Sequence, residues 1–551
     1  MKMLKYISGV AVVLACLAGV AWLNRVKIIL LLAEFKVPAV APNHAVTWDQ
    51  GPAVAARPAE QRPPNIVVIL ADDLGYNDIT VHGGGVAGGV VPTPNIDSIA
   101  HDGVELSNGY AGDATCAPSR AAIMTGRYGT RFGFEFTPAP VAFARVIAMM
   151  ESGQPHPPVF HDDVVENIPP LDKEAIPASE ITVAELLRKQ GYHTLHFGKW
   201  HLGGAAGSRP EDKGFDESLG FIPGASLYLP KNDPNVENSR QEFDPIDLFL
   251  WAGLPWGVQF NGSPWFEPAG YMTDYLTDEA VAAVHANRNR PFFLYFAPNA
   301  VHTPLQATKA DFDALGKIPD HRLRVYAAIV RNLDRNVGRL LQSLKDAGLD
   351  RNTLVVFTSD NGGAHYIGLP AINRPFRGWK ATFFEGGMHV PYFMRWPTRI
   401  QPGTKYAEPV GHVDIFATAA AAAGATVPTD RVIDGVDLLP FVTGQNTSQP
   451  HKDLFWRSGN YRVVLAGGWK LQRITQPEKQ FLFNLGVDPT EQHNLVASEP
   501  EKLKELRYLM DQVDRQQAKP LWPSVLSGAI AIDHPGGQPM LPGDEYIMWD
   551  N

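Results

Sequence analysis

Cysteine is almost absent from this chain: only two of its 551 residues are cysteines, Cys16 and Cys116. Cys16 lies in an apolar N-terminal run, so a domain that follows this run has a single thiol and can form no internal disulfide. A fold held together by disulfides is therefore excluded. Cys116, in the stretch GDATCAPSRAAIMTGRYG, needs another explanation.

The chain also lacks the positive charge that nucleic-acid binding requires. It has 48 lysines and arginines against 58 aspartates and glutamates, which gives a formal net charge of -10. Since a surface that follows phosphates needs clustered Lys and Arg, we expect no nucleic acid as a partner, and an anionic ligand needs a local cationic pocket. With 45% hydrophobic and 19% charged residues, the composition suits one large α/β domain and a smaller unit.

The N-terminus carries a long apolar run. Residues 6–23 are uncharged, with two lysines before them and Arg25 and Lys27 after them. Such a run is typical of an export signal or of a membrane-spanning helix. The nearest small-x-small cleavage site, Ala39-Val40-Ala41, lies far downstream, which favours an uncleaved anchor within residues 1–36. We therefore expect an exported protein, periplasmic and anchored to the inner membrane; secretion after signal cleavage is the alternative.

Three further segments follow the apolar run. Residues 37–63 are rich in Pro and Ala without periodicity, which predicts a linker. Residues 64–440 alternate short apolar runs, such as NIVVIL and PFFLYFAP, with helical patterns, such as the long amphipathic run 322–347. This alternation predicts a mainly parallel sheet covered by helices on both faces. Residues 441–551 indicate a small C-terminal α+β subdomain with short antiparallel strands and a helix over 499–516.

Oxygen-bearing side chains follow two of the predicted strands. Asp72-Asp73 come directly after NIVVILA, and Asp360-Asn361 come directly after TLVVFTS. Ligands bind at the carboxyl ends of strands in such sheets, and four hard oxygen ligands suit Ca²⁺ or Mg²⁺ better than zinc. Taken alone, either pair is more often a helix cap or a turn, so the prediction depends on both pairs occurring together.

Lysines and histidines also cluster after apolar runs. Lys199 and His201 lie in HFGKWHLGG, His302 lies in NAVHTPLQA, and Lys380 lies in RGWKATFFEGG. These side chains are candidates for proton transfer and anion binding near neutral pH. Taken singly, each histidine is more often a hydrogen-bonded structural residue, and each lysine is more often a solvated surface charge. The hypothesis of proton transfer and anion binding therefore depends on their joint placement at one sheet edge.

The segments around these residues resemble those of one enzyme family. CAPSRAAIMTG, residues 116–126, is similar to the C-x-P-S-R-x-x-x-x-T-G signature of the type I sulfatases, and GKWHLG is similar to their second signature. ADDLGYND, TPNIDSIA, SDNGG, RGWKATFFEGGMHVP, HVDIFAT and LFNLGVDPTEQHNL also resemble family segments, in family order. The resemblance covers about residues 64–500 and is strongest to bacterial arylsulfatase-like members.

The resemblance implies an alkaline-phosphatase-like α/β sandwich and one bound Ca²⁺ ion. It also implies that a formylglycine-generating enzyme oxidises Cys116 to Cα-formylglycine. The substrate would be a small-molecule or carbohydrate sulfate ester, hydrolysed when the metal-bound formylglycine hydrate attacks sulfur. The aldehyde would then re-form as sulfate leaves, a step that an ordinary serine could not perform. Cys116 would thus be a precursor of the nucleophile.

Each matching residue receives a role from the same resemblance. Ca²⁺ would be bound by Asp72, Asp73, Asp360 and Asn361, with the modified Cys116 completing the site. Arg120 would stabilise the formylglycine hydrate, and His201 would take the proton that drives sulfate release. The sulfate oxygens would be bound, and the leaving group protonated, with the help of Lys199, His302 and Lys380.

Two other functions remain open from the sequence. A phosphodiesterase or phosphonate monoester hydrolase of the same superfamily could use the same nucleophile beside a hard metal. An inactive, membrane-anchored binding protein could keep the fold without the chemistry, although all ten matching residues are present. The chain departs from many relatives at His389 in GGMHVP, where they have Arg, and we assign this position no catalytic role.

Overall fold

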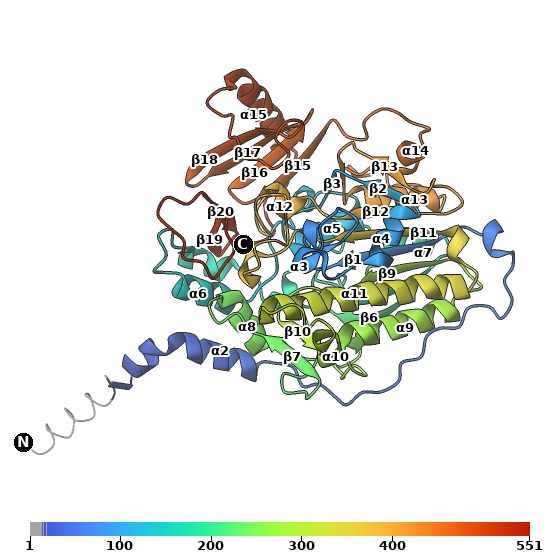
Figure 1. Cartoon of the computed structure of the whole chain (residues 1–551), viewed down its shortest axis with the longest axis horizontal. Coiled ribbons are helices and arrows are strands. Elements are labelled where there is room, and N and C mark those ends of the chain that lie inside the picture. The colour runs from blue at the N-terminus through green and yellow to red at the C-terminus, as the bar shows by residue number, and fades with distance from the viewer. Residues whose placement is uncertain (1–13, 15, 18) are drawn as a thin grey trace, which may run out of the picture.

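The computed structural model describes residues 14, 16–17 and 19–551, and a nine-stranded sheet forms the centre of the fold (Figure 1). The strand order is β13-β2-β12-β11-β1-β9-β5-β6-β8. The strands β11, β1, β9, β5 and β6 are mutually parallel, whereas β12 and β8 are antiparallel to their neighbours. Their bounds are β1 Asn65–Ala71, β2 Val104–Leu106, β5 His193–Lys199, β6 Glu217–Phe221, β8 Gln259–Phe260, β9 Phe292–Ala297, β11 Thr353–Ser359, β12 Tyr392–Arg395 and β13 Thr404–Tyr406.

Helices cover both faces of this sheet, because the central strands are apolar on both sides. In β1, Val67 and Ile69 belong to the core beneath one set of helices, and Ile66 and Val68 belong to the core beneath the other. The first set comprises α4 Pro94–His101, α9 Met272–Ala286 and α11 His321–Asp346. The second set comprises α5 Cys116–Thr125, α7 Val183–Lys189 and α13 Asp414–Ala422. The predicted α/β sandwich with a large, mainly parallel sheet is confirmed.

A second, smaller sheet follows in the C-terminal part of the chain. It has four antiparallel strands in chain order, β15 Asp453–Ser458, β16 Tyr461–Ala466, β17 Trp469–Thr475 and β18 Glu478–Asn484, with α15 Pro500–Asp514 packed against it. The last strands, β19 Leu526–Ala531 and β20 Tyr546–Asp550, pair with each other, and β19 also pairs with β4 Val159–Phe160. The C-terminal α+β unit is as predicted, and the exact boundary at residue 440 stays a prediction.

The predicted anchor or signal segment, residues 1–36, lies partly outside the described residues, which omit 1–13, 15 and 18. Within it, helix α2, Arg25–Phe35, packs beside α6 Val141–Met150 and α8 Pro245–Gly253 (Figure 1). Over the part of the chain that the structure describes, no helix has the length and apolar character needed to cross a membrane. The predicted linker is irregular but attached to the domain: the Trp48 ring is buried, with its centroid 4.8 Å from that of Phe197.

Candidate active site

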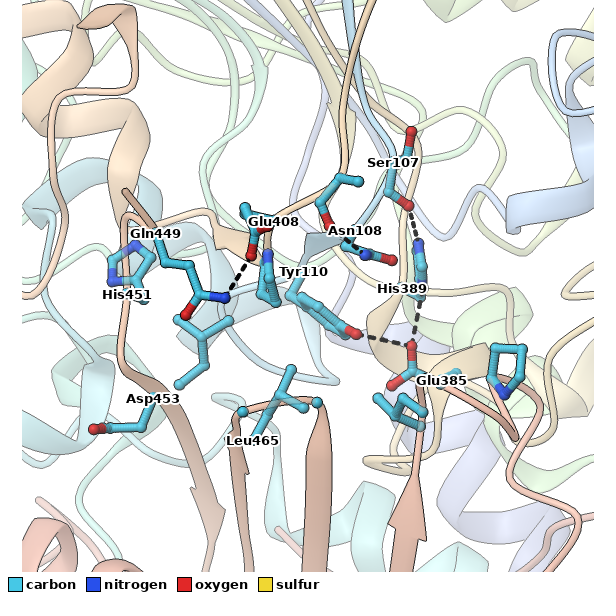
Figure 2. A pocket seen from close by; sticks show the side chains of 18 of the residues that line it. Ser107, Asn108, Tyr110, Glu385, His389, Glu408, Gln449, His451, Asp453 and Leu465 are labelled. Atoms are coloured by element: carbon cyan, nitrogen blue, oxygen red, sulfur yellow. Dashed lines mark hydrogen bonds and ion pairs between the residues drawn. The ribbon is translucent and has the colours of Figure 1, made fainter. Parts of the chain in front are cut away.

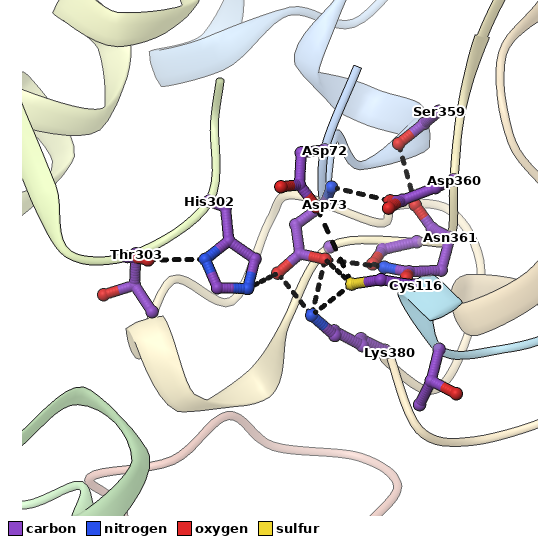
Figure 3. Close-up of polar contacts among 12 residues, drawn as sticks. Asp72, Asp73, Cys116, His302, Thr303, Ser359, Asp360, Asn361 and Lys380 are labelled. Carbon is purple, nitrogen blue, oxygen red and sulfur yellow. Dashed lines mark hydrogen bonds and ion pairs between the residues drawn. The ribbon is translucent and has the colours of Figure 1, made fainter. Parts of the chain in front are cut away.

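The candidate residues converge because four neighbouring parallel strands end at the same edge of the sheet. Asp72 and Asp73 follow β1, Asp360 and Asn361 follow β11, and His302 lies in the loop after β9. Lys199 is the last residue of β5, and His201 lies two residues beyond it. Arg120 comes from α5 and Lys380 from the loop before the short helix α12 Glu385–Met388. Segments more than 300 residues apart in the sequence thus meet at one site (Figure 3).

The acidic side chains are fully buried and linked to one another. The amide of Asn361 donates to Asp73 Oδ1 over 2.7 Å, and the backbone N–H of Asp73 donates to Asp360 Oδ1 over 3.2 Å. Burial raises the pKa of Asp72 to about 7, although Lys199 opposes the rise. For Asp360, burial would raise the pKa, but Arg120 and Lys199 more than offset it, so this carboxyl stays ionised.

Three buried cations neutralise these carboxylates. Lys199 Nζ lies 2.9 and 2.8 Å from the two oxygens of Asp72, and Arg120 Nη2 lies 2.8 Å from Asp360 Oδ2. Lys380 Nζ lies 2.8 Å from Asp73 Oδ1. The formal charges of three carboxylates and three cations cancel, so an added divalent cation would leave the site with a charge suited to an anionic ester.

Cys116 lies among these groups at the first position of α5. Its Sγ atom is 3.7 Å from Asp72 Oδ1 and 3.9 Å from Asp73 Oδ1, and Lys380 Nζ lies 3.1 Å from the sulfur (Figure 3). Burial, with a contribution from Asp360, raises the pKa of the thiol to about 12. At neutral pH the sulfur is therefore protonated, which makes an unmodified Cys116 a poor nucleophile.

Both candidate histidines are neutral. Burial lowers the pKa of His302 to about 3, and it lowers the pKa of His201 well below its usual value, with Lys199 adding to the effect. The Nδ1 atom of His302 faces the carbonyl of Thr303 and must donate to it, which leaves Nε2, 3.7 Å from Asp73 Oδ2, as the atom that faces the site. The Nδ1 atom of His201 is buried without a hydrogen-bond partner.

The donor set fits a hard divalent cation. Asp72, Asp73, Cys116 and His302 offer ligand atoms that all lie within 4.8 Å of one another. The carbonyl oxygen Oδ1 of Asn361 is buried with no hydrogen-bond partner, as expected for an atom that could face a cation. Carboxylate and amide oxygens are the ligands that Ca²⁺ prefers. His302 belongs to this group by geometry, although the family resemblance assigned it to the sulfate group and not to the metal.

Backbone strain is concentrated around the same residues. Asp73, His201 and Ala381 have φ values of 61°, 60° and 63°, in the left-handed region that residues with a Cβ rarely adopt. Two of them are candidate site residues, and the third directly follows Lys380. Strained backbone of this kind persists where the surrounding structure fixes it, and it is common at functional sites.

Several residues that sequence reasoning missed support the site. Tyr366 contacts both Asp73 and Lys380, and burial raises the pKa of its phenol well above its usual value. Behind the Lys380 loop, the ammonium of Lys470 lies 2.7 Å from Glu385 and 3.0 Å from Glu491. No local sequence pattern singles out Tyr366 or Lys470, and each has a partner far away in the sequence, so the sequence alone could not identify them.

His389, a position without an assigned role, lies beside a cavity of about 490 Å³ (Figure 2). There it connects the start of α12 with the segment around Ser107. One ring nitrogen lies 2.9 Å from Glu385 Oε2, and the other lies 2.8 Å from the carbonyl of Ser107. Its ring also stacks on Phe376. None of the ten candidate site residues lines this cavity, so His389 is structural in this arrangement.

The sandwich of helices about a mainly parallel sheet, with a buried carboxylate and lysine cluster at the strand ends, defines an alkaline-phosphatase-like hydrolase. Residues 64–425 match the family model "Sulfatase", and residues 377–519 match "N-sulphoglucosamine sulphohydrolase, C-terminal". The chain therefore belongs to the sulfatase family and is a sulfuric ester hydrolase. This confirms the resemblance predicted from the signature segments.

Named relatives agree with this assignment. The chain is 34% identical over 438 residues to N-acetylgalactosamine-6-sulfatase of Mus musculus, which covers 78% of this chain and 75% of the relative. It is 31% identical over 544 residues to steryl-sulfatase of Mus musculus, covering 82% and 81%. Among solved structures, Ps i-CgsB in complex with k-i-k-neocarrahexaose superposes with a TM-score of 0.69 at 30% identity, covering 84% of this chain and 95% of that one.

Proposed function

We propose that this sulfatase hydrolyses sulfate esters with a formylglycine hydrate made from Cys116 and bound to Ca²⁺. The observation that carries the proposal is the position of Cys116, within 4 Å of Asp72 and Asp73 and 3.1 Å from Lys380. Ca²⁺ would supply charge that favours a deprotonated hydroxyl at this position. Asp72, Asp73, Asp360 and Asn361 would hold the ion, and the buried thiol itself is unsuited to attack because of its raised pKa.

The remaining residues would bind the ester and move protons. In the overall reaction, the sulfur–oxygen bond to the alcohol breaks, water supplies the new oxygen, and R–OH, sulfate and one proton result. Lys199 and Lys380 would bind sulfate oxygens and protonate the leaving alcohol through their ammonium groups. His302, whose Nε2 faces the site without a proton in the neutral ring, would help in both tasks after it gains a proton, which a bound sulfate anion favours. The neutral imidazole of His201 can accept a proton, as the release of sulfate requires.

Arg120 would hold the nucleophile end of the site in place. Its guanidinium is fully buried, donates to Asp360 and to the carbonyl of Lys199, and lies on the same helix as Cys116 one turn later. This position supports its proposed role in stabilising the formylglycine hydrate. A helix that begins at Cys116 also directs backbone N–H groups toward an anion bound there.

The proposed substrate is a small-molecule or carbohydrate sulfate ester. Among the similar proteins, one is named N-acetylgalactosamine-6-sulfatase, one is named steryl-sulfatase, and one solved structure is a complex with k-i-k-neocarrahexaose. These names support an organic sulfate ester in general, with carbohydrate sulfates well represented. A formylglycine-generating enzyme would be the partner during maturation.

For location, we propose export with retention at the inner membrane by the N-terminal segment; secretion after cleavage is the alternative. The apolar run of residues 6–23 between cationic flanks supports this. Beyond it, α2 exposes Leu31, Leu32 and Phe35, side chains that suit an interfacial environment.

Mass spectrometry of the Cys116 peptide from native cells tests the proposal directly. Conversion of the thiol to the aldehyde changes the peptide mass, and aldehyde-reactive hydrazide labelling should occur on wild type but not on Cys116→Ala. An unmodified thiol in active enzyme would overturn the proposed nucleophile. Turnover of a sulfate monoester should also exceed turnover of the matched phosphonate monoester; faster phosphonate turnover would favour the other enzyme class.

A further inference from the structure

Tyr366 connects two groups to which the proposed function gives different tasks. Its hydroxyl lies 3.1 Å from Asp73 Oδ2, and the ammonium of Lys380 lies 3.2 Å from the same hydroxyl. Asp73 is a proposed metal ligand, and Lys380 is proposed to bind the sulfate group. The sequence offered no reason to select this tyrosine.

The direction of both hydrogen bonds is fixed by chemistry. An ammonium group has three donors and no acceptor, so Lys380 donates to the Tyr366 oxygen. The single phenolic proton is then left for the carboxylate of Asp73, which can only accept. Tyr366 therefore orders both neighbours at once.

The backbone around Tyr366 holds the hydroxyl in this position. Tyr366 lies in the 3-10 turn η7, His365–Ile367, and its side chain is buried in the main hydrophobic core. The carbonyl of His365 accepts hydrogen bonds from the backbone N–H groups of Gly368 and Gly536, the latter in the loop between β19 and β20. The turn is thus anchored by a segment from the far end of the chain.

We propose that Tyr366 is a positioning residue that couples the metal-binding carboxylate Asp73 to the sulfate-binding ammonium of Lys380. The inference rests on the proposed function, because that function assigns the two tasks. The hydroxyl holds the Asp73 carboxylate in a fixed orientation, and it provides a fixed acceptor for Lys380 when this lysine also contacts a sulfate oxygen. Partners that orient metal ligands in this way strengthen metal binding.

Calcium affinity measured by titration calorimetry tests this role without depending on turnover. Tyr366→Phe removes one oxygen and keeps the ring, and we expect the Kd for Ca²⁺ to rise about 10- to 100-fold, the range for loss of a partner of a metal ligand. Tyr275→Phe is the matched control. Its hydroxyl is also buried but lacks a hydrogen-bond partner in the structure, and it lies on α9 away from the site.

A double-mutant cycle tests the coupling itself. Lys380→Met removes a positive charge beside Asp73 and should by itself lower the Kd for Ca²⁺, because less repulsion opposes the cation. If Tyr366 acts together with Lys380, the fold-increase in Kd caused by Tyr366→Phe should be smaller in the Lys380→Met background than in the wild type. A merely structural role would instead lower the Tm of Tyr366→Phe and leave its Kd within twofold of wild type. That result, or two effects that multiply, overturns the inference.

The wild-type titration separates this inference from the proposed function. If the wild type binds Ca²⁺ and hydrolyses a sulfate ester while Tyr366→Phe binds equally well, only the role of Tyr366 is wrong. If the wild type binds no Ca²⁺, the proposed metal site is wrong and the inference falls with it. Should Tyr366→Phe lack a cooperative thermal transition, the Lys380→Met variant still reports whether Lys380 influences Asp73. An unchanged Kd for Ca²⁺ overturns the coupling, and a Kd lowered by the loss of repulsion supports it.

Discussion

Replacing Lys470 by Met should destabilise the protein by several kcal/mol, because Lys470 neutralises two buried carboxylates. The side chain of Lys470 is 1% exposed, and its ammonium lies 2.7 Å from Glu385 and 3.0 Å from Glu491. Lys470 belongs to β17, whereas Glu385 begins α12 just after the loop that carries Lys380. Met fills a similar volume, so the change removes the charge with little change in packing.

The size of the destabilisation follows from the buried carboxylates that remain when Lys470 is removed. Removing one partner of a buried ion pair leaves an uncompensated charge and costs about 3–5 kcal/mol. In the wild type, burial would raise the pKa of Glu385, but Lys470 and His389 more than offset this and hold it at about 2, whereas burial raises the pKa of Glu491 to about 7. Without Lys470 both values rise, so both groups tend to bind a proton in the folded state.

The sign of the pH dependence follows from these shifts. A carboxyl whose pKa is raised on folding binds more protons folded than unfolded, so its folded form is favoured at low pH and loses stability as pH rises. The free energy of unfolding of Lys470→Met should therefore lie furthest below that of the wild type near pH 8, and the difference should shrink toward pH 5. Urea unfolding followed by tryptophan fluorescence measures it at both pH values.

Two controls make the result decisive. Lys504→Met changes an exposed lysine on α15 of the same subdomain and should alter the unfolding free energy by less than about 0.5 kcal/mol, as expected for a surface position. Adding Glu491→Gln to Lys470→Met should recover part of the loss. A deficit below about 1 kcal/mol at pH 8, or one that does not change with pH, would refute the reasoning, since a broken buried ion pair costs more.

Three further predictions concern the site and its surroundings. Burial raises the pKa of Asp78 to about 8 from 3.8. As pH rises from 4 to 9, the wild type must lose this proton or hold it at growing cost, so its free energy of unfolding falls. The free energy of unfolding of Asp78→Asn, which has no such proton, should therefore rise by about 5 kcal/mol relative to wild type over this pH range, as measured by urea unfolding. A smaller difference than about 1 kcal/mol would contradict the assigned burial cost. A Cβ at Gly224 would lie 2.8 Å from Cε1 of His201, so Gly224→Ala should displace the imidazole. We expect kcat to fall about 100-fold while circular dichroism shows an intact fold. An unchanged kcat would exclude a role for His201 at its observed position. Chelation should abolish sulfatase activity and added Ca²⁺ should restore it; full activity after exhaustive chelation would rule out a required exchangeable metal.

The strands and the residues that follow them could be predicted from the sequence. Apolar runs such as 65–71 and 353–359 are long enough to be buried strands, and each is followed directly by a pair of oxygen-bearing side chains, Asp72-Asp73 and Asp360-Asn361. Because parallel strands end at a common edge, local pattern was enough to expect Asp72 and Asp360 at one place. The two signature segments added Cys116 and Lys199 to that place through the family resemblance.

Contacts between distant side chains could not be predicted in the same way. Tyr366 follows Asp360-Asn361 by a few residues, but nothing in its neighbourhood indicates that its hydroxyl reaches Asp73, 293 residues earlier. The contact of His389 with the carbonyl of Ser107, 282 residues earlier, was equally hidden, although its other partner, Glu385, is only four residues away.

The sequence by itself determined the class of fold, the family and the set of candidate residues, because periodicity and short signatures are local properties of the chain. The tertiary structure alone decided which of these groups touch: that Lys380 contacts Cys116 and Asp73, that Tyr366 joins them, and that Lys470 of the C-terminal sheet supports the same loop from behind. The physical reason is that burial and charge pairing depend on the packing of whole elements, which brings side chains hundreds of residues apart within hydrogen-bonding distance.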